Sequence, residues 1–160
     1  ECVIGLCPGA EYGSAKRWPA YKFQTLVKEV NERLDCQWVI LGTAADRSLA
    51  AEISHGIPNI TDLTGKTSLG QLMELLSKIT GLVTNDTGTM HLADFIGTPL
   101  AALFGSTEPS LTGPRSPRSV VIRQKAECSP CFLRECPIDF RCMQDIPMEK
   151  VIEAVLAFRK

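Results

Sequence analysis

One stretch decides the fold of this chain: Thr84-Asn85-Asp86-Thr87-Gly88-Thr89-Met90-His91-Leu92-Ala93-Asp94-Phe95-Ile96-Gly97-Thr98-Pro99. An apolar run, Gly81-Leu82-Val83, precedes it, and a second, Leu100-Ala101-Ala102-Leu103-Phe104, follows it. Short apolar runs bounded by turn residues are typical of buried strands, and the stretch between them has the length of a helix. The predicted order is therefore strand, polar turn, helix, strand.

Both ends of this helix carry recognisable signals. Asp86 or Thr87 caps its first turn, because a short side-chain oxygen can accept hydrogen bonds from the free amides there. Gly97 and then Pro99 end it, since glycine favours the last cap and proline cannot continue a helix. The predicted helix therefore occupies most of the quoted stretch.

The start of this helix suits a phosphate group. Its first amides have no partner within the helix and carry a partial positive charge. Gly88 has no side chain, so a ligand can approach the backbone closely, and His91 falls near any anion held there. Most capped helices bind nothing, so a purely structural cap remains open on this stretch alone.

Strands and helices alternate along the rest of the chain. Helices are expected to start at Pro19 and at Ser68, the second with Leu69, Leu72, Met73 and Leu76 facing inward. The other expected helices are Asp46 to Ser54 and Met148 to Phe158, and the other strands are Cys2–Cys7, Gln37–Leu41, Asn59–Leu63 and Ser119–Arg123. Near-continuous apolar strands that alternate with helices predict a parallel sheet covered on both faces.

Polar, glycine-containing loops follow most of these strands. In open parallel sheets, ligands bind beyond the carboxyl ends of the strands, where the strand order reverses. We therefore expect one cleft to form from the loop 8–19, Thr43, Lys66-Thr67, Asp86 to His91, and Ser106-Thr107.

Composition bounds the function. A chain of 160 residues with 44% hydrophobic residues and a net charge of −1 indicates one folded domain, not a nucleic-acid binder. No apolar run reaches the roughly 20 residues of a membrane span. The chain opens in a strand-like segment without Met, which suggests a piece of a longer protein.

Two common cofactor and metal motifs are missing. No Gly-x-Gly-x-x-Gly occurs, which disfavours a nicotinamide dehydrogenase. No two aspartates are separated by a single residue, so the Asp-x-Asp metal site of many nucleotide-sugar enzymes is absent. We therefore assign no metal to the predicted cleft.

The cysteines form a separate feature. The chain has seven, and Cys128, Cys131, Cys136 and Cys142 fall within one short segment. Four thiolates this close in sequence could hold zinc or an iron–sulfur cluster, stay reduced, or pair as disulfides. Cys2, Cys7 and Cys36 lie in or beside predicted strands and are expected to be small core residues.

Four ordered motifs together resemble the heptosyltransferases of glycosyltransferase family 9. They are residues 8–19, Leu63-Thr64-Gly65-Lys66-Thr67-Ser68-Leu69, Thr84-Asn85-Asp86-Thr87-Gly88 with His91, and Phe104-Gly105-Ser106-Thr107-Glu108-Pro109. The cysteine cluster is also similar. Asp94 departs from the resemblance, because a small apolar residue is usual at that position.

The resemblance implies a Rossmann-like, three-layer α/β/α sandwich with a parallel sheet, the C-terminal half of a GT-B glycosyltransferase. Residues 1–160 would then be a single nucleotide-sugar-binding domain, without the N-terminal acceptor domain and its aspartate base. Such a fragment is expected to be inactive alone. The resemblance places the enzyme in the cytoplasm, at the inner face of the bacterial inner membrane, with peripheral membrane contact.

The resemblance also implies a reaction and a set of site residues. The family transfers L-glycero-D-manno-heptose from ADP-heptose to the inner core on lipid A, with inversion and without a metal or other cofactor. Lys16 and Asp86 would serve catalysis, Lys16 as a mobile charge and Asp86 as a cap. Lys16, Asp86, Thr87, Gly88, Thr89 and His91 would surround the diphosphate, with Thr43, Asp46 and Thr67 near adenosine.

Two other functions remain open. The chain could be the donor domain of a different GT-B sugar-nucleotide enzyme, such as an epimerase, which donor competition between ADP and UDP sugars would distinguish. It could also be a metal- or redox-responsive module built around the cysteines, which metal analysis under reducing conditions would reveal. The sequence names neither the acceptor nor the oligomeric state.

Overall fold

A single six-stranded parallel sheet forms the centre of the molecule. The computed structural model describes residues 1–159, and the strand order within them is β3-β2-β1-β4-β5-β6. All five strand pairs are parallel, as expected from the alternation of strands and helices. The strands are β1 (Val3–Cys7), β2 (Gln37–Ile40), β3 (Ile60–Asp62), β4 (Gly81–Asn85), β5 (Leu100–Phe104) and β6 (Ser119–Arg123).

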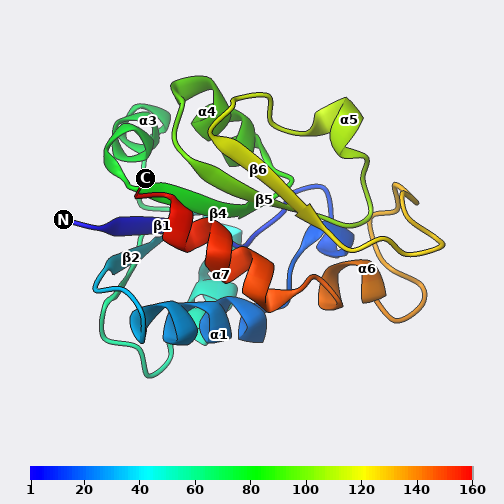
Figure 1. Cartoon of the computed structure of the whole chain (residues 1–160), viewed down its shortest axis with the longest axis horizontal. Helices are drawn as coiled ribbons and strands as arrows, with labels where there is room; N and C mark the ends of the chain where they lie inside the picture. The colour runs from blue at the N-terminus through cyan, green and yellow to red at the C-terminus, as the bar shows by residue number, and fades with distance from the viewer. Residues whose placement is uncertain (160) are drawn as a thin grey trace.

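Helices cover both faces of this sheet, so the molecule has three layers. One face carries α1, α2 and α7, and the other carries α3 and α4 (Figure 1). The long helices are α1 (Ala20–Asn31), α2 (Arg47–Ser54), α3 (Leu69–Lys78), α4 (Gly88–Ile96) and α7 (Met148–Ala157). Shorter helices are η1 (Ser14–Lys16), η2 (Ala44–Asp46), α5 (Pro109–Thr112) and α6 (Arg141–Gln144). The Rossmann-like, three-layer prediction is confirmed.

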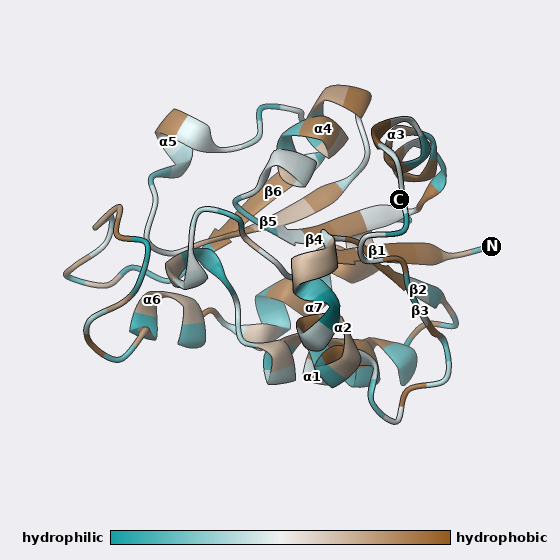
Figure 2. Cartoon of the chain, turned by 180° about the vertical axis from the view of Figure 1, so that it is seen from behind, coloured by the Kyte–Doolittle hydropathy of each residue, from teal (hydrophilic) through white to brown (hydrophobic). Residues whose placement is uncertain are grey.

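The core is split by the sheet into two apolar clusters. Phe23 and Ile152 belong to the cluster under α1, α2 and α7, and Leu76 and Met90 to the cluster under α3 and α4. The central strands are mostly hydrophobic, whereas the helices carry hydrophobic and hydrophilic residues in alternating bands (Figure 2). Burial on both faces therefore explains why the strands read as near-continuous apolar runs.

Two side chains that were expected to face inward do not. Leu69 is 67% exposed and Met73 is 39% exposed, while Leu76 of the same helix is fully buried. Leu69 is seven residues before the buried Leu76 and shares its side of α3, but it is the first residue of the helix and remains exposed there. Leu69 instead contributes to the rim of a pocket.

The element boundaries differ slightly from the expected ones. Helix α1 ends at Asn31, and the helix expected from Asp46 is a 3-10 turn followed by α2. The helices α5 and α6 were not predicted, because four residues are too few to show a helical period. Ser68 caps α3 as expected, in a reciprocal pair with Gln71.

Asp94, the residue that departs from the family resemblance, anchors a loop. Its carboxylate accepts hydrogen bonds from the amides of Arg115 and Ser116 at 2.8 and 3.0 Å, and from the Ser119 hydroxyl at 2.7 Å. Burial alone would raise the pKa of Asp94, but these hydrogen bonds outweigh burial and hold its pKa below the usual range. Asp94 thus ties α4 to the start of β6.

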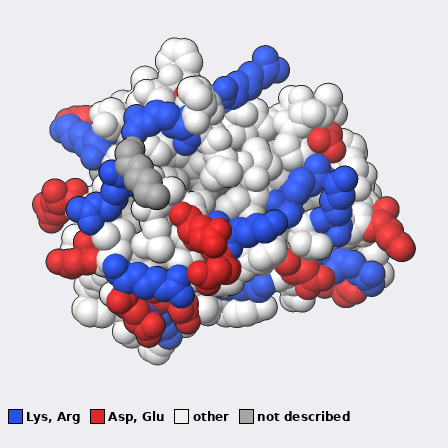
Figure 3. Space-filling view, in the orientation of Figure 1, with Lys and Arg blue, Asp and Glu red and all other residues white. Residues whose placement is uncertain are grey.

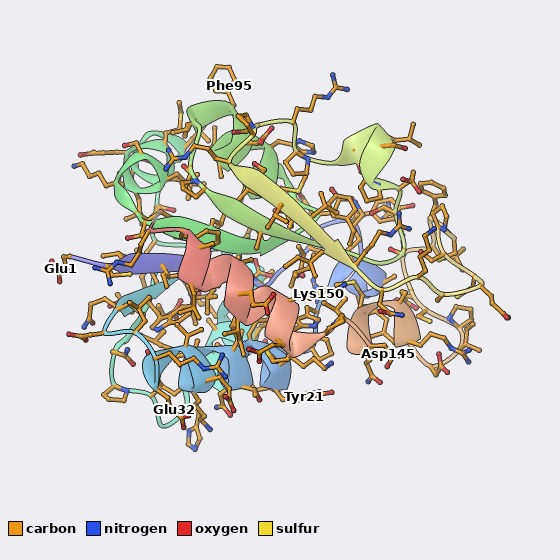
Figure 4. The ribbon with its side chains drawn as sticks, in the orientation of Figure 1. Glu1, Tyr21, Glu32, Phe95, Asp145 and Lys150 are labelled. Atoms are coloured by element: carbon orange, nitrogen blue, oxygen red, sulfur yellow. The ribbon has the colours of Figure 1, made fainter. Side chains whose placement is uncertain are left out.

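The molecular surface is mixed. Acidic and basic side chains are interspersed on the face seen in Figure 3. Phe95, on the outer side of α4, projects into solvent and is 86% exposed (Figure 4). Across residues 1–159, no helix is both long and apolar enough to cross a membrane.

The hydrogen bonds to Asp94 generate a stability prediction. Asp94→Asn should lower the free energy of unfolding at pH 7 by about 1–2 kcal/mol, because hydrogen bonds to a charged acceptor are lost or weakened. Since the folded pKa is depressed, this stabilisation is complete above the unfolded pKa of about 3.9 and disappears as the pH falls through the folded value. Urea unfolding at several pH values measures it.

The exposed carboxylate of Asp35 offers a matched control. Asp35→Asn should leave the unfolding free energy nearly unchanged at every pH. An Asp94→Asn penalty that stayed constant down to about pH 3 would contradict the electrostatic account.

Candidate functional site

The site lies where the strand order of the sheet reverses. The chain leaves β1 toward β2 and β3 on one side, and returns to place β4 on the other side of β1. Beyond the carboxyl ends of these central strands lies a pocket of about 650 Å³. All nine residues predicted to bind the donor line this pocket: Lys16, Thr43, Asp46, Thr67, Asp86, Thr87, Gly88, Thr89 and His91.

The helix start that was predicted to hold a phosphate opens into this pocket. Thr87 is the cap of α4, because its hydroxyl accepts a hydrogen bond from the amide of Met90 at 3.2 Å. The capping role assigned to Asp86 was therefore wrong. The amides of Gly88 and Thr89, ahead of Met90 in the first turn, point out of the helix start and are available to an anion.

Asp86 instead forms a buried ion pair. Its Oδ2 accepts a hydrogen bond from Nζ of Lys16 at 2.9 Å, and the two side chains are 5% and 15% exposed. The hydroxyl of Thr107 donates to the same oxygen at 2.8 Å, and that of Thr112 lies 3.4 Å from it. The expectation that Lys16 is a mobile charge was wrong, since Asp86 fixes its ammonium group at the pocket wall.

Tyr12 adds a second contact to Lys16. Nζ of Lys16 lies 4.9 Å from the centre of the Tyr12 ring, and the guanidinium of Arg134 lies 4.8 Å from the same centre. A cation over an aromatic face is attracted by the ring. The Tyr12 hydroxyl donates to the carbonyl of Phe132 at 2.8 Å, which fixes the ring. Sequence reasoning missed this role, because nothing in the spacing pairs Tyr12 with Lys16.

The loop that carries Lys16 is clamped by Asn85 at the end of β4. The fully buried Asn85 amide donates to the carbonyls of Pro8 and Gly9, and its oxygen accepts from the amide of Trp18 at 3.1 Å. These bonds hold both ends of the loop against the central strand. Trp18 is fully buried against Phe23, so it packs the loop onto the core.

Asp46 shapes the opposite wall of the pocket. Its Oδ2 accepts from the amide and the hydroxyl of Thr43, at 2.8 and 3.0 Å, which caps the turn before α2. A Cβ on Gly9 would lie 2.4 Å from Oδ1 of Asp46, and one on Gly42 would lie 2.7 Å from Oδ2. Only glycine allows these loops to approach the carboxylate so closely.

Cys7 lies at the floor of the pocket, at the end of β1. Burial raises the pKa of its thiol, and this effect outweighs hydrogen bonding to nearby threonine hydroxyls. Its sulfur lies 3.9 Å from the Thr87 hydroxyl oxygen. Cys7 is therefore a protonated packing residue, and we assign it no nucleophilic role.

Some of the residues expected at the cleft lie outside it, among them Lys66, Ser106 and Thr107. Lys66 points away, with Nζ on the carbonyl of Asp62 at 2.7 Å. Thr107 is buried behind Asp86, and Ser106 faces a different cavity. Another hollow, of about 670 Å³, lies between β6 and α7. It is at the edge of the sheet, away from the strand ends where the polar loops meet.

The clustered cysteines surround a small cavity of their own. Cys128, Cys131, Cys136 and Cys142 all line a space of about 70 Å³. All seven cysteines within residues 1–159 carry free thiols. In this part of the chain, no three His, Cys, Asp or Glu side chains are arranged to hold a metal ion as they stand.

The fold and the cleft together define an α/β domain with a pocket at the carboxyl ends of its central strands, the place where ligands bind in open parallel sheets. Residues 1–140 match the family model of glycosyltransferase family 9 (heptosyltransferase), and the chain belongs to that family. The alternative of an epimerase-type enzyme is therefore set aside.

Individual relatives agree with the family match. The chain is 40% identical to lipooligosaccharide heptosyltransferase 2 of Haemophilus influenzae over 129 residues. The match covers 76% of this chain and 36% of the relative. Over 158 residues it is 32% identical to the corresponding protein of Campylobacter jejuni, covering 94% of this chain and 49% of that protein.

A solved structure is similar over the whole chain. The structure of Escherichia coli ADP-heptose LPS heptosyltransferase II matches 99% of this chain and 46% of its own, with a TM-score of 0.86 and 33% identity. The chain spans half or less of the length of these relatives.

The buried ion pair generates the second prediction. A double-mutant cycle with Lys16→Met and Asp86→Asn should give a coupling energy of about 2 kcal/mol, because removing either partner leaves a buried charge without its counterion. Urea unfolding of the four proteins measures the coupling.

The exposed pair Lys78–Glu74 provides a matched control. Its cycle, with Lys78→Met and Glu74→Gln, should give a much smaller coupling, since solvent screens exposed charges. Equal couplings in the two cycles would show that Lys16 and Asp86 are not held as a desolvated pair.

Proposed function

We propose that this chain is the donor-binding half of a heptosyltransferase of lipopolysaccharide core synthesis. The donor is ADP-heptose, and L-glycero-D-manno-heptose passes with inversion to the inner core on lipid A. The acceptor and an aspartate base are held by the other half of the enzyme. The observation that carries the proposal is one pocket in which Lys16 and the start of α4 both face the space for a diphosphate.

The name of the solved Escherichia coli relative supports this donor. That protein is described as an ADP-heptose LPS heptosyltransferase, and it is 33% identical to this chain over the matched region, which is 46% of that protein. A lipid-linked acceptor places the reaction at the cytoplasmic face of the bacterial inner membrane. Contact with that membrane would be peripheral.

The chemistry requires stabilisation of the leaving group. When the anomeric C–O bond breaks, negative charge develops on the diphosphate, and fixed positive groups aimed at it lower the barrier. Lys16 has three N–H donors, of which Asp86 takes one, so the others can reach phosphate oxygens. The amides of Gly88 and Thr89 supply the second source of positive potential.

The carboxylates at the pocket argue for transfer without a divalent metal at the diphosphate. A magnesium ion there would need carboxylate oxygens that are free to bind it. Asp86 is engaged by Lys16, and Asp46 by Thr43. Glu11 is the only other carboxylate among the described residues that line the pocket. In this proposal Thr43, Asp46 and Thr67 contact the adenosine of the donor. His91 contacts its phosphates.

Nucleotide binding tests the role of the α4 start. Gly88→Val should lower ADP affinity at least tenfold, because a branched side chain would cover the amides that meet phosphate. A Cβ at Gly88 meets nothing within 4 Å, so the variant fits the fold. Calorimetry measures the affinity under two conditions, one with added Mg²⁺ and one without Mg²⁺ in a small excess of EDTA. Parent protein should bind ADP in both arms.

Gly70→Val is the matched control, since Gly70 also lies in a first helical turn with open space around it. It should bind ADP like the parent. Folded Gly88→Val with parental affinity would refute the phosphate site, and binding that needs Mg²⁺ would refute the metal-free donor site.

Turnover of the full-length enzyme tests Lys16. Lys16→Ala should lower kcat by roughly a hundredfold, because a contact that strengthens as charge develops is worth roughly 2–4 kcal/mol. Heptose transfer from ADP-heptose is the assay. Lys66→Ala, at a lysine that faces away from the pocket, should keep parental turnover. Parental kcat in folded Lys16→Ala would return Lys16 to a purely structural role.

A further inference from the structure

The segment between β6 and α7 has little regular structure, and none of its residues before α6 is buried. Only the four-residue α6 interrupts it. Two of its non-glycine residues, Phe132 and Phe140, are held in the left-handed region, with φ of 57° and 59°. Such conformations are costly and persist only where the surroundings impose them. A loop of this length in a compact domain is uncommon unless something binds it together.

All four cysteines of the segment face one space. They close around the cavity of about 70 Å³, together with Ala15 and apolar side chains such as Leu133 and Ile138. The fold of the segment therefore brings all four thiols to the wall of one small cavity. Cys128 and Cys131 are separated by two residues, the spacing of many structural thiolate sites.

Two polar groups also point to thiolate ligands. The hydroxyl of Ser106 lies on the cavity wall, is 1% exposed, and has no hydrogen-bond partner among residues 1–159. A buried hydroxyl without a partner needs an explanation, such as a group missing from the cavity. The backbone N–H of Phe140 donates to the sulfur of Cys136 at 3.3 Å. A thiolate is a much stronger acceptor for such a bond than a thiol.

We propose that Cys128, Cys131, Cys136 and Cys142 bind one thiophilic metal ion, zinc or iron, in a tetrahedral site. Each thiol releases its proton to solvent as its sulfur binds, and the metal keeps its oxidation state. Four protein ligands leave no open position, so the ion is structural. The thiols are not yet in ligand geometry, so binding turns the sulfurs toward one point and draws the segment inward. The Ser106 hydroxyl then donates to a ligand sulfur.

The proposed ion would brace the loop that carries Lys16. The carbonyl of Arg134, between Cys131 and Cys136, accepts from the amide of Ala15 at 2.9 Å. The carbonyl of Phe132 accepts from the Tyr12 hydroxyl. A Cβ on Gly13 would lie 2.2 Å from the Arg134 carbonyl oxygen, so loop and segment are in close contact. Metal loss should therefore loosen the wall that positions Lys16.

Metal content of the full-length enzyme, purified under reducing conditions, tests the site. Elemental analysis after gel filtration should give close to one zinc or iron per chain. Cys131→Ser should lose most of the metal, whereas Cys36→Ser, at a buried cysteine outside the cavity, should keep it. Metal-free parent titrated with Co²⁺ should develop the sulfur-to-metal and d–d bands of a tetrahedral thiolate site. This arm needs no variant, so the site is testable even if Cys131→Ser fails to fold.

Parent protein without bound metal, and without these bands on Co²⁺ addition, would overturn the site. So would disulfides among the four cysteines in protein kept reduced. Dilute EDTA should leave the ion in place, because four thiolates bind such metals tightly. Prolonged dialysis against a strong thiophilic-metal chelator gives the metal-free enzyme.

Comparing the ADP affinity of metal-loaded and metal-free enzyme tests whether the ion supports the loop that carries Lys16. This part of the inference rests on the proposed function. Metal-free enzyme should bind ADP at least several-fold more weakly than metal-loaded enzyme. Equal, measurable affinities would overturn the brace alone, because metal content decides the site independently. Failure of both forms to bind ADP would instead count against the donor pocket.

Discussion

The ion pair between Lys16 and Asp86 is the contact on which the arrangement of the site depends. It joins the loop after β1 to the end of β4, the two neighbouring strands at which the strand order of the sheet reverses. A lysine side chain is flexible, and its ammonium group would be screened and mobile in solvent. Asp86, held by the Thr107 hydroxyl, fixes that charge at a desolvated wall. The other contacts of the loop, from Asn85 and from the carbonyl of Phe132, keep the pair assembled.

The same ion pair also determines the electrostatic environment of the pocket. The negative charge of Asp86 offsets much of the positive charge of Lys16 at distances longer than their own separation of 2.9 Å. In the donor site that we propose, selectivity for a diphosphate would come from geometry at short range, through the unused N–H groups of Lys16 and the first amides of α4. Such preorganised groups need not reorganise as charge develops on the leaving group, which is the condition for electrostatic catalysis.

Much of this arrangement follows from the sequence, because the signals are local. The apolar runs predicted the strands, and the polar residues after them predicted the pocket, since parallel strands end at one edge. The contacts of Asp86 could not be predicted, because Thr107 and Thr112 lie more than twenty residues away and carry no signal. A short polar residue before a helix is typical of a helix cap, so Asp86 and Thr87 both qualify by sequence. Only the structure shows that Thr87 is the cap and that Asp86 pairs with Lys16.

The loop that carries Lys16 is held from two sides by different means. Asn85 holds its ends from the sheet, where a buried side chain replaces missing backbone partners. The cysteine segment holds its middle from outside, through carbonyls of residues that no strand or long helix orders. The first support is inseparable from the core, so it is as stable as the fold. The second support depends on whatever orders residues 128–142. A change in the order of this segment would therefore alter the position of Lys16, even though the segment lies outside the pocket.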